Sequence, residues 1–296
     1  MSIQQLINGI SLGSVYALIA VGFALIFNIL KFSNFSHGGV MVVTAYTGYL
    51  SAIGLKNFIS STPLFVITVA VAALAGGLVA LIVERVAFRR LRINKSPVIY
   101  YFVSSITMGM LLENLVTVFA SSNFYSYPFT LGSQVVHLGR FTVATSDLFM
   151  LTFSAISLLL LIWVLYKTRM GVAIRALSFD VNTSSLMGMD VNFVIMATFV
   201  ASGILGGISG VFLGINYTLY PQLGKMITKG FIASVIGGLG NITGAVIGAI
   251  LLGVTEVFFI GLVGSGITPV FLFFIMLAFL LIRPQGIAGK IVQEKA

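Results

Sequence analysis

The stretch KTRMGVAIRALSFDVNTSSLMGMDVN, residues 167–192, is a polar segment between two long apolar segments, 146–166 and 193–215. Charged side chains such as Arg175 and Asp180 would each cost about 2.5–3.5 kcal/mol at the centre of a bilayer. The segment can form helix, but it has to lie in water or against a soluble partner. Each flanking segment is long enough to cross a hydrocarbon core of ~30 Å. The chain is therefore predicted to cross a membrane on either side of a short, structured polar loop.

The composition of the whole chain agrees with this prediction. Hydrophobic residues make up 58% of the 296 residues, charged residues make up 8%, and the mean hydropathy is +1.12. Soluble domains carry about 25% charged residues, so an integral membrane protein is predicted. The apolar segments are 3–30, 38–54, 63–84, 97–119, 146–166, 193–215, 229–239, 242–262 and 267–282. They predict an all-α polytopic bundle of about eight or nine transmembrane helices, with residues 1–296 forming one transmembrane domain.

The net charge of +9 is distributed unevenly between the two sets of alternating loops. Of the 16 lysines and arginines, 12 fall in one set and four in the other. The first set holds Lys31, Arg85, Arg89, Arg90, Arg92, Lys95, Lys167, Arg169, Arg175, Arg283, Lys290 and Lys295, and the second holds Lys56, Arg140, Lys225 and Lys229. Because basic loops stay inside, the polar segment and the C-terminus are predicted to be cytoplasmic and the N-terminus external. The first segment lacks the features of a cleaved signal peptide, and we expect it to be retained.

Two apolar segments are interrupted. ILKFSNFSHGG, residues 29–39, contains several polar side chains, and GGLGNITG, residues 237–244, follows an apolar run of about eleven residues. Eleven helical residues reach only ~17 Å, about half of the hydrocarbon core, which indicates a half-helix or re-entrant arm within 229–244. Non-helical backbone at membrane depth is tolerated beside a cavity, so these breaks point to a solute path, although ordinary loops would give the same pattern.

The ends of such broken helices suit a zwitterionic solute. A half-helix N-terminus offers partial positive charge to a carboxylate, while carbonyl, Asn and Ser oxygens can accept from an ammonium group. The candidate path residues are Asn34, Ser36, His37, Gly38, Thr44, Thr107, Asn114, Ser234 and Asn241.

Few other residues offer chemistry. Glu113 and Glu256 are the acids well inside predicted spans, and we expect both near the outer ends, where they can reach interfacial water. The two histidines, His37 and His137, are too few for a metal site, so no metal is expected. The chain has no cysteine, which excludes disulfides and thiol chemistry.

No phosphate-binding loop occurs either. The nearest approach, Leu223 to Met226, lacks the leading glycine and the hydroxyl that would hold magnesium. ATP hydrolysis by this chain is excluded, and no string of acids suggests ion coupling. A partner ATPase that binds residues 167–192 would supply the energy for transport. The alternative is that these residues form a surface helix without a partner.

Several stretches carry a resemblance to a known family. NFSHGG (34–39), GVAIRALSFDVNTSSLMGMDV (171–191) and KGFIASVIGGLGNITGAVIGAILLG (229–253) resemble the permease subunits of bacterial branched-chain amino acid ABC transporters. QLINGISLGSVYALIAVGFALIF (5–27) and RPQG (283–286) do so too, and the similarity runs in order over nearly the whole chain. The chain most closely resembles the H-type partner of the two permeases that such systems pair.

The resemblance implies a multi-pass subunit of the bacterial inner membrane that transports rather than catalyses covalent chemistry. It implies as partners a second permease, two ATP-binding subunits that carry ATP and magnesium, and an extracytoplasmic solute-binding protein. This chain itself would bind no cofactor and no nucleic acid. The solute would be a branched-chain or related amino acid.

The family's coupling pattern falls within residues 167–192. We expect Asp180 to cap a short helix that presents Leu186 as an apolar contact. The chain departs from many relatives at Val172, which puts that residue in doubt as a contact. The coupling residues are Gly171, Arg175, Ala176, Asp180, Leu186 and Gly188.

Other functions remain open at this point. Permeases for urea, short amides or sugars share the same scaffold. An ion-coupled secondary transporter acting alone and a membrane scaffold without a path are further alternatives.

Overall fold

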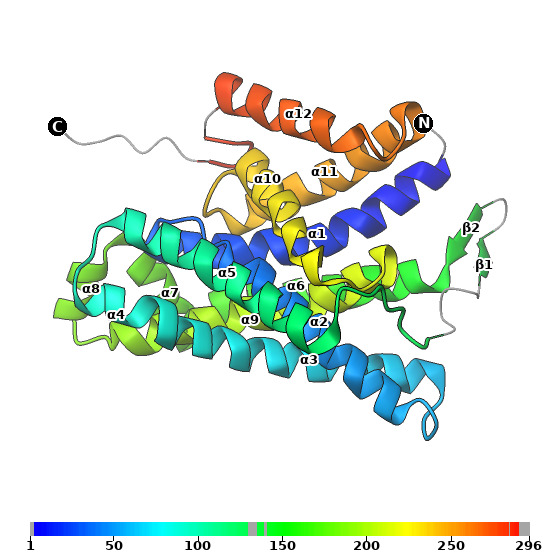
Figure 1. Ribbon diagram of the computed structural model, residues 1–296. Helices are drawn as coiled ribbons and strands as arrows, with labels where there is room; N and C mark the ends of the chain where they lie inside the picture. Colours follow the sequence, from blue (N-terminus) through cyan, green and yellow to red (C-terminus); the bar gives the residue numbers. More distant parts are fainter. Residues whose placement is uncertain (1–2, 130–134, 139–140, 284, 290–296) are drawn as a thin grey trace.

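The computed structural model describes residues 3–129, 135–138, 141–283 and 285–289, and most of these residues are helical (Figure 1). The α-helices are α1 (Ile3–Leu30), α2 (Ser36–Leu55), α3 (Ser61–Val83), α4 (Arg89–Ile93), α5 (Val98–Ala120), α6 (Thr145–Lys167), α7 (Arg169–Phe179), α8 (Val181–Leu186), α9 (Val191–Tyr217), α10 (Ile227–Gly237), α11 (Ile242–Val263) and α12 (Thr268–Ile282). A π-helix, η1 (Glu84–Phe88), joins α3 to α4, and a 3-10 helix, η3 (Pro221–Met226), precedes α10.

Among the described residues, seven helical segments are long and apolar enough to cross a membrane. They are α1, α2, α3 with its extension to Ile93, α5, α6, α9 and α11. One further apolar helix, α12, is shorter, with 15 residues, and α10 has 11 residues. The predicted all-α polytopic bundle is therefore confirmed in the described part of the chain, and the candidate spans are roughly consistent with the eight or nine expected passes.

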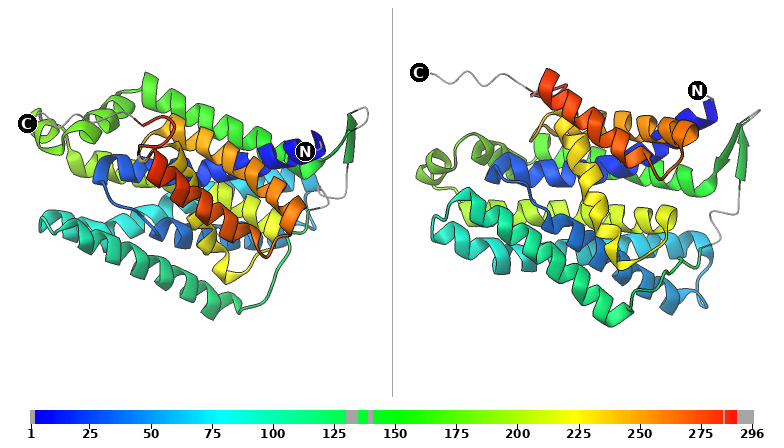
Figure 2. Two further views of the ribbon diagram at one scale, coloured as in Figure 1. Left: turned by 90° about the horizontal axis from the view of Figure 1, so that it is seen from above. Right: turned by 45° about the horizontal axis from the view of Figure 1, so that its top comes forward.

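Helix α1 is the centre of the bundle. It packs against α6, α9, α10 and α11, while α9 also packs against α2 and α3 (Figures 1 and 2). At the crossing of α1 and α11, a Cβ atom on Gly253 would collide with the backbone of Gly13, so the two helices touch backbone to backbone. A Cβ atom on Gly76 of α3 would likewise collide with Gly203 of α9. Small residues permit such close contacts where lipid supplies no hydrophobic force between helices.

The first predicted break is present. Residues 31–35 are not helical, and α2 begins at Ser36 beside the midpoints of two long helices. A Cβ atom on Gly39 would meet Gly109, halfway along α5, and one on Gly206, midway along α9, would meet the ring of His37. The N-terminus of α2 therefore lies deep inside the bundle rather than at its end.

The second predicted break is larger than expected, because the irregular chain begins before α10 as well as after it. Residues 218–226 and 238–241 flank an 11-residue helix, which agrees with the predicted half-helix. Helix α10 runs antiparallel to α11, with Gly237 against Gly244 and Ala233 against Gly248. The 3-10 helix η3, which precedes α10, packs on the first turn of α2. The two breaks therefore meet.

A C-terminal segment closes the end of α10. Ile287 N donates to the carbonyl of Ile236 (2.9 Å), and Ala288 N donates to that of Gly237 (3.0 Å). Asn241 Nδ2 donates to the carbonyl of Ala288 (2.7 Å). The last carbonyls of α10, which have no partner within their own helix, are thus satisfied by chain that follows α12.

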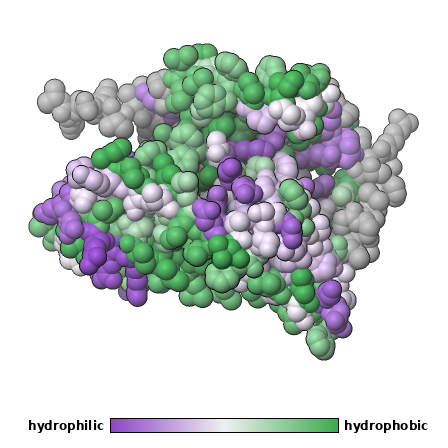
Figure 3. Space-filling view, viewed as in Figure 1, coloured by the Kyte–Doolittle hydropathy of each residue, from purple (hydrophilic) through white to green (hydrophobic). Residues whose placement is uncertain are grey.

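The two ends of the bundle differ. The short helices α4, α7 and α8 gather at one end, while β1 (Val135–Leu138) and β2 (Phe141–Ala144) form an antiparallel hairpin at the other, beside the start of α1 (Figure 1). The hairpin was not predicted. Between the ends, hydrophobic residues cover much of the face seen in Figure 3, as a lipid-facing surface requires.

Candidate functional site

The polar segment folds as two short helices that are fixed at their starts. The Thr168 side chain accepts from Gly171 N at the start of α7 (3.1 Å). Asp180 caps α8, accepting from the amides of Asn182 (2.8 Å) and Thr183 (3.3 Å) and from the Thr183 hydroxyl (2.6 Å). These hydrogen bonds, that of the Thr183 hydroxyl first, lower the pKa of Asp180. The predicted cap is therefore confirmed.

The ends of α7 and α8 present apolar side chains to the surroundings. Phe179, the last residue of α7, is 93% exposed, and Leu186 and Met187 at the end of α8 are 88% and 79% exposed. Gly188 follows with φ +81°, a conformation that suits glycine and ends the helix. A capped helix with exposed apolar residues at one end of a membrane bundle has the form of a docking element.

Arg175, Gly171 and Ala176 lie differently from Leu186. The Arg175 guanidinium turns inward: Nη1 donates to the Leu165 carbonyl, and Cζ lies 5.1 Å from the centre of the Tyr166 ring. Gly171 is buried against the same turn of α6, and Ala176 is partly buried. Arg175 and Gly171 hold α7 to the end of α6, whereas Leu186 projects from the loop.

The candidate path residues at the first break form one buried cluster around the start of α2. Asn34 Oδ1 accepts from Ser36 N (3.2 Å) and from Ser36 Oγ (2.6 Å). His37 Nδ1 lies 3.3 Å from Ser202 Oγ, and its Nε2 has no partner among the described residues. Gly38 packs on Gly224 of η3. Thr44, one helical turn and a half further, bonds to carbonyls of its own helix.

The other candidate path residues do not join this cluster. Thr107 and Asn114 lie on the exposed face of α5, where each bonds to its own helix. Ser234 is buried in α10, and its hydroxyl has no partner among the described residues. Asn241 caps α11 by accepting from Gly244 N (3.0 Å). The nine residues therefore occupy three regions rather than one site.

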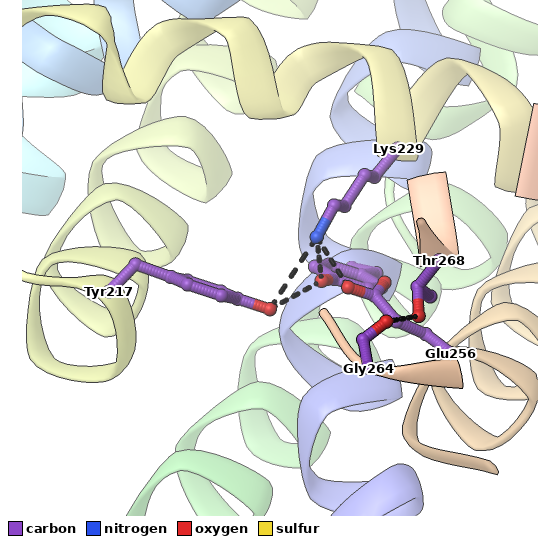
Figure 4. Close-up of polar contacts among 6 residues, drawn as sticks. Tyr217, Lys229, Glu256, Gly264 and Thr268 are labelled. Atoms are coloured by element: carbon purple, nitrogen blue, oxygen red, sulfur yellow. Dashed lines mark hydrogen bonds and ion pairs between the residues drawn. The ribbon is translucent and has the colours of Figure 1, made fainter. Parts of the chain in front are cut away.

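A buried charged cluster was missed by sequence reasoning (Figure 4). Lys229 Nζ lies 2.6 Å from Glu256 Oε1, 2.8 Å from the Tyr16 hydroxyl and 3.5 Å from the Tyr217 hydroxyl. The two hydroxyls are 2.9 Å apart. The cluster joins four helices, α1, α9, α10 and α11.

The cluster corrects two sequence expectations. Lys229 does not lie in an outer loop but in α10, beside the middle of α1, and Glu256 does not face interfacial water but is buried and paired. Charge counting placed Lys229 outside because it stands at the edge of an apolar run. Two opposite charges in neighbouring apolar segments were the available signal, because an ionisable group inside a membrane needs a partner.

Comparisons with known proteins show which family this chain belongs to. The model of the family described as "Branched-chain amino acid transport system / permease component" matches residues 5–282. The chain belongs to this family.

Curated members of the branched-chain amino acid permease family match over nearly their full length. The "High-affinity branched-chain amino acid transport system permease protein LivH" of Escherichia coli (strain K12) is 33% identical, with 99% of this chain and 97% of that protein covered. BraD of Pseudomonas aeruginosa, with the same description, is 32% identical with the same coverage. A "Probable branched-chain amino acid transport permease protein LivH" of Methanocaldococcus jannaschii is 28% identical, covering 93% of this chain and 89% of that protein.

One comparison with a solved structure, "PsaBC from Streptococcus pneumoniae in complex with Fab", covers 96% of this chain and 92% of the matched chain in that structure. Its TM-score of 0.47 and sequence identity of 17% are too low to show a common fold. Family membership and the seven long apolar helices make the protein a multi-pass transport permease of the inner membrane. Membership in a family of ABC permeases also implies that it works with other transporter components.

Proposed function

We propose that this chain is the permease subunit of an ATP-driven importer for branched-chain or related amino acids. With a second permease it forms the translocation path, and an external binding protein delivers the solute. The observation that supports this proposal is the family match over residues 5–282, which includes both breaks and the polar segment. The whole chain, with residues 167–192 as its coupling loop, is one permease domain.

The coupling role rests on the geometry of the polar segment. Leu186, Met187 and Phe179 supply an apolar contact for a groove on an ATP-binding subunit, in the manner of a helix docked in a groove. Gly171 and Arg175 fix the loop to α6, the Ala176 carbonyl accepts from Asp180 N at the end of α7, and Asp180 and Gly188 fix the bounds of α8. Movement of the partner is then passed to α6 and α9 without bending the loop. ATP and magnesium are held by the partner subunits.

The translocation role rests on the two breaks, which meet deep in the bundle. Irregular backbone at this depth is tolerated beside a cavity or a moving element. The buried polar atoms of His37 and Ser234 that lack partners in the described chain are consistent with a change of packing during transport.

Uptake by cells that carry the chain with its native partners tests the proposal. Deleting the gene should abolish ATP-dependent uptake of labelled leucine, isoleucine and valine, and the intact gene should restore it. Uptake of urea, short amides or a sugar instead would overturn the choice of solute. Leucine uptake by the purified chain alone in ATP-free liposomes would overturn the importer and favour an ion-coupled carrier.

A further inference from the structure

An open groove lies where the two breaks meet the exposed face of α5. Its volume is about 450 Å³, within the range of small-ligand sites. The walls come from α5, from the turn before α2, and from η3 with the first turn of α10. Figure 3 shows hydrophilic residues in the middle of this face of the molecule, with hydrophobic surface above and below them.

The groove contains one acid and one base, which are close enough to attract each other but form no ion pair in the described part of the chain. The carboxylate of Glu113 lies over Gly224, where a Cβ atom would collide with it, and Lys225 is the next residue. No ion pair or hydrogen bond to either side chain occurs within the described part of the chain. Lys229 and Glu256, in contrast, neutralise each other at 2.6 Å.

Glu113 lies near the middle of α5 rather than at the outer end that the sequence predicted, and Lys225 of η3 lines the same groove. Glu113 is one turn beyond Gly109, the midpoint of α5, which corresponds to about 6 Å along the helix axis. A charge at such depth is costly against lipid and marks a solute or ion path unless it is paired. The groove therefore needs a ligand or partner that supplies both signs of charge over a short distance.

The apolar wall narrows the chemistry of that ligand. Phe35, Phe102, Ile106 and Met110 line the groove beside the two charges, and Thr228 also lines it. An α-amino acid with an aliphatic side chain carries an ammonium and a carboxylate on one carbon and an apolar group beside them. Its ammonium suits Glu113, its carboxylate suits Lys225, and its side chain suits the apolar wall.

We propose that this groove is a binding station for a zwitterionic aliphatic amino acid on the translocation path, with Glu113 and Lys225 as the two charge contacts. The inference rests on the proposed function and assigns residues to it. The open side of the groove faces away from this chain, and the second permease closes it.

Cysteine labelling tests access to the groove in the assembled importer. The chain has no native cysteine, so Thr228→Cys and Met110→Cys each introduce a single thiol. A charged, membrane-impermeant thiol reagent should label both, and leucine with ATP should slow the labelling at least threefold. Leu159→Cys, on the exposed apolar face of α6, is the matched control and should stay unlabelled.

Two leucine analogues test whether binding in the groove requires both the ammonium and the carboxylate of the ligand. 3-Methylbutylamine lacks the carboxylate and 4-methylpentanoate lacks the ammonium, so neither should protect Thr228→Cys at concentrations where leucine does. Protection by either analogue as strong as that by leucine, or no labelling of the two groove thiols, would overturn the proposal.

Charge removal gives an independent readout. Glu113→Gln and Lys225→Met should each reduce leucine uptake per assembled complex at least tenfold, while Lys56→Met, outside the groove, should have no effect. The exchange Glu113→Lys with Lys225→Glu should stay impaired, because reversing the charges turns the aliphatic group away from the wall. Restoration by the exchange would show a simple ion pair.

Normal uptake by both single variants would overturn the station, and uptake by the unmodified chain separately tests the proposed function.

Discussion

Lys229 and Glu256 show what a buried charge requires of its neighbours. The ammonium group has the carboxylate, two tyrosine hydroxyls and the faces of both tyrosine rings within about 5 Å, with Nζ 5.2 Å and 5.0 Å from the ring centres of Tyr16 and Tyr217. Such a pair contributes little net stability compared with well-packed apolar residues, but removing one partner leaves an uncompensated charge. Its role here is to fix the start of α10 against three other helices.

Breaking this pair should destabilise the protein far more than removing it altogether. We expect Glu256→Leu to cost about 3–5 kcal/mol, because Lys229 then keeps a charge that no carboxylate compensates. The double variant Lys229→Met with Glu256→Leu should recover most of this loss. Thermal unfolding of the purified protein in detergent, followed by size-exclusion chromatography, measures both. Equal losses in the single and double variants would contradict the pairing.

Asp180 should make the cap of α8 insensitive to pH in the physiological range. Hydrogen bonds to Thr183 and Asn182 lower its pKa in the folded state below the ordinary value of about 3.9. The stabilisation is therefore complete above this value and is lost as the pH falls through the lower, folded pKa. Hydrogen exchange of the amides of α8 should show no contribution from this group between about pH 6 and 8.

Substitution distinguishes the cap from a mere surface charge. Asp180→Ala should speed exchange of the α8 amides and reduce uptake, while Asp180→Asn, which keeps the accepting oxygen, should change both much less. Slow exchange in Asp180→Ala would show that α8 does not depend on its cap.

At the scale of elements, the residues of the polar segment have two different roles. Some attach the loop to α6, and others are exposed for contact with a partner. Arg175 binds the end of α6, so a charge reversal there damages the loop's own attachment. Leu186 and Phe179 touch little of this chain and are available to a partner. Sequence reasoning found the segment, its cap and its exposed leucine. It did not find the direction of Arg175, because that depends on where α6 ends relative to α7.

Leu186→Asp combined with Phe179→Asp should therefore release the ATP-binding subunits and leave the permease folded. We expect co-purification of those subunits to fall at least tenfold, since two apolar contacts become charged. Asn182→Asp, at another exposed position on α8, adds a similar charge and should leave the complex intact. Undiminished co-purification of the double variant would place the docking surface elsewhere.

On the scale of the whole molecule, hydrophobic segments predicted most of the fold. The bounds of α1, α9 and α11 agree closely with the apolar runs, because a bilayer leaves helix as the way to satisfy the backbone. The half-helix α10 followed from length alone. The site could be predicted only in part, because the meeting of η3 with α2 and the pairing of Lys229 with Glu256 depend on contacts between segments far apart in the chain.

The orientation of the whole bundle remains a prediction from loop charge, and single cysteines can measure it. Lys56→Cys, between α2 and α3, should react with an impermeant thiol reagent in intact cells. Ser185→Cys on α8 should react only after the membrane is opened, because the basic loops lie on the cytoplasmic side. The reverse pattern would invert the bundle and place the polar segment out of reach of any ATPase.

The hydrogen bonds from Ile287 and Ala288 to the end of α10 carry a consequence for biosynthesis. The ribosome makes α10 before α11 and α12, so the last carbonyls of α10 enter the membrane without their final partners. Until the chain beyond α12 arrives, α10 has to be shielded by the insertion machinery or by water. Closure of the second break is thus a late event, completed after the ribosome has finished every spanning helix.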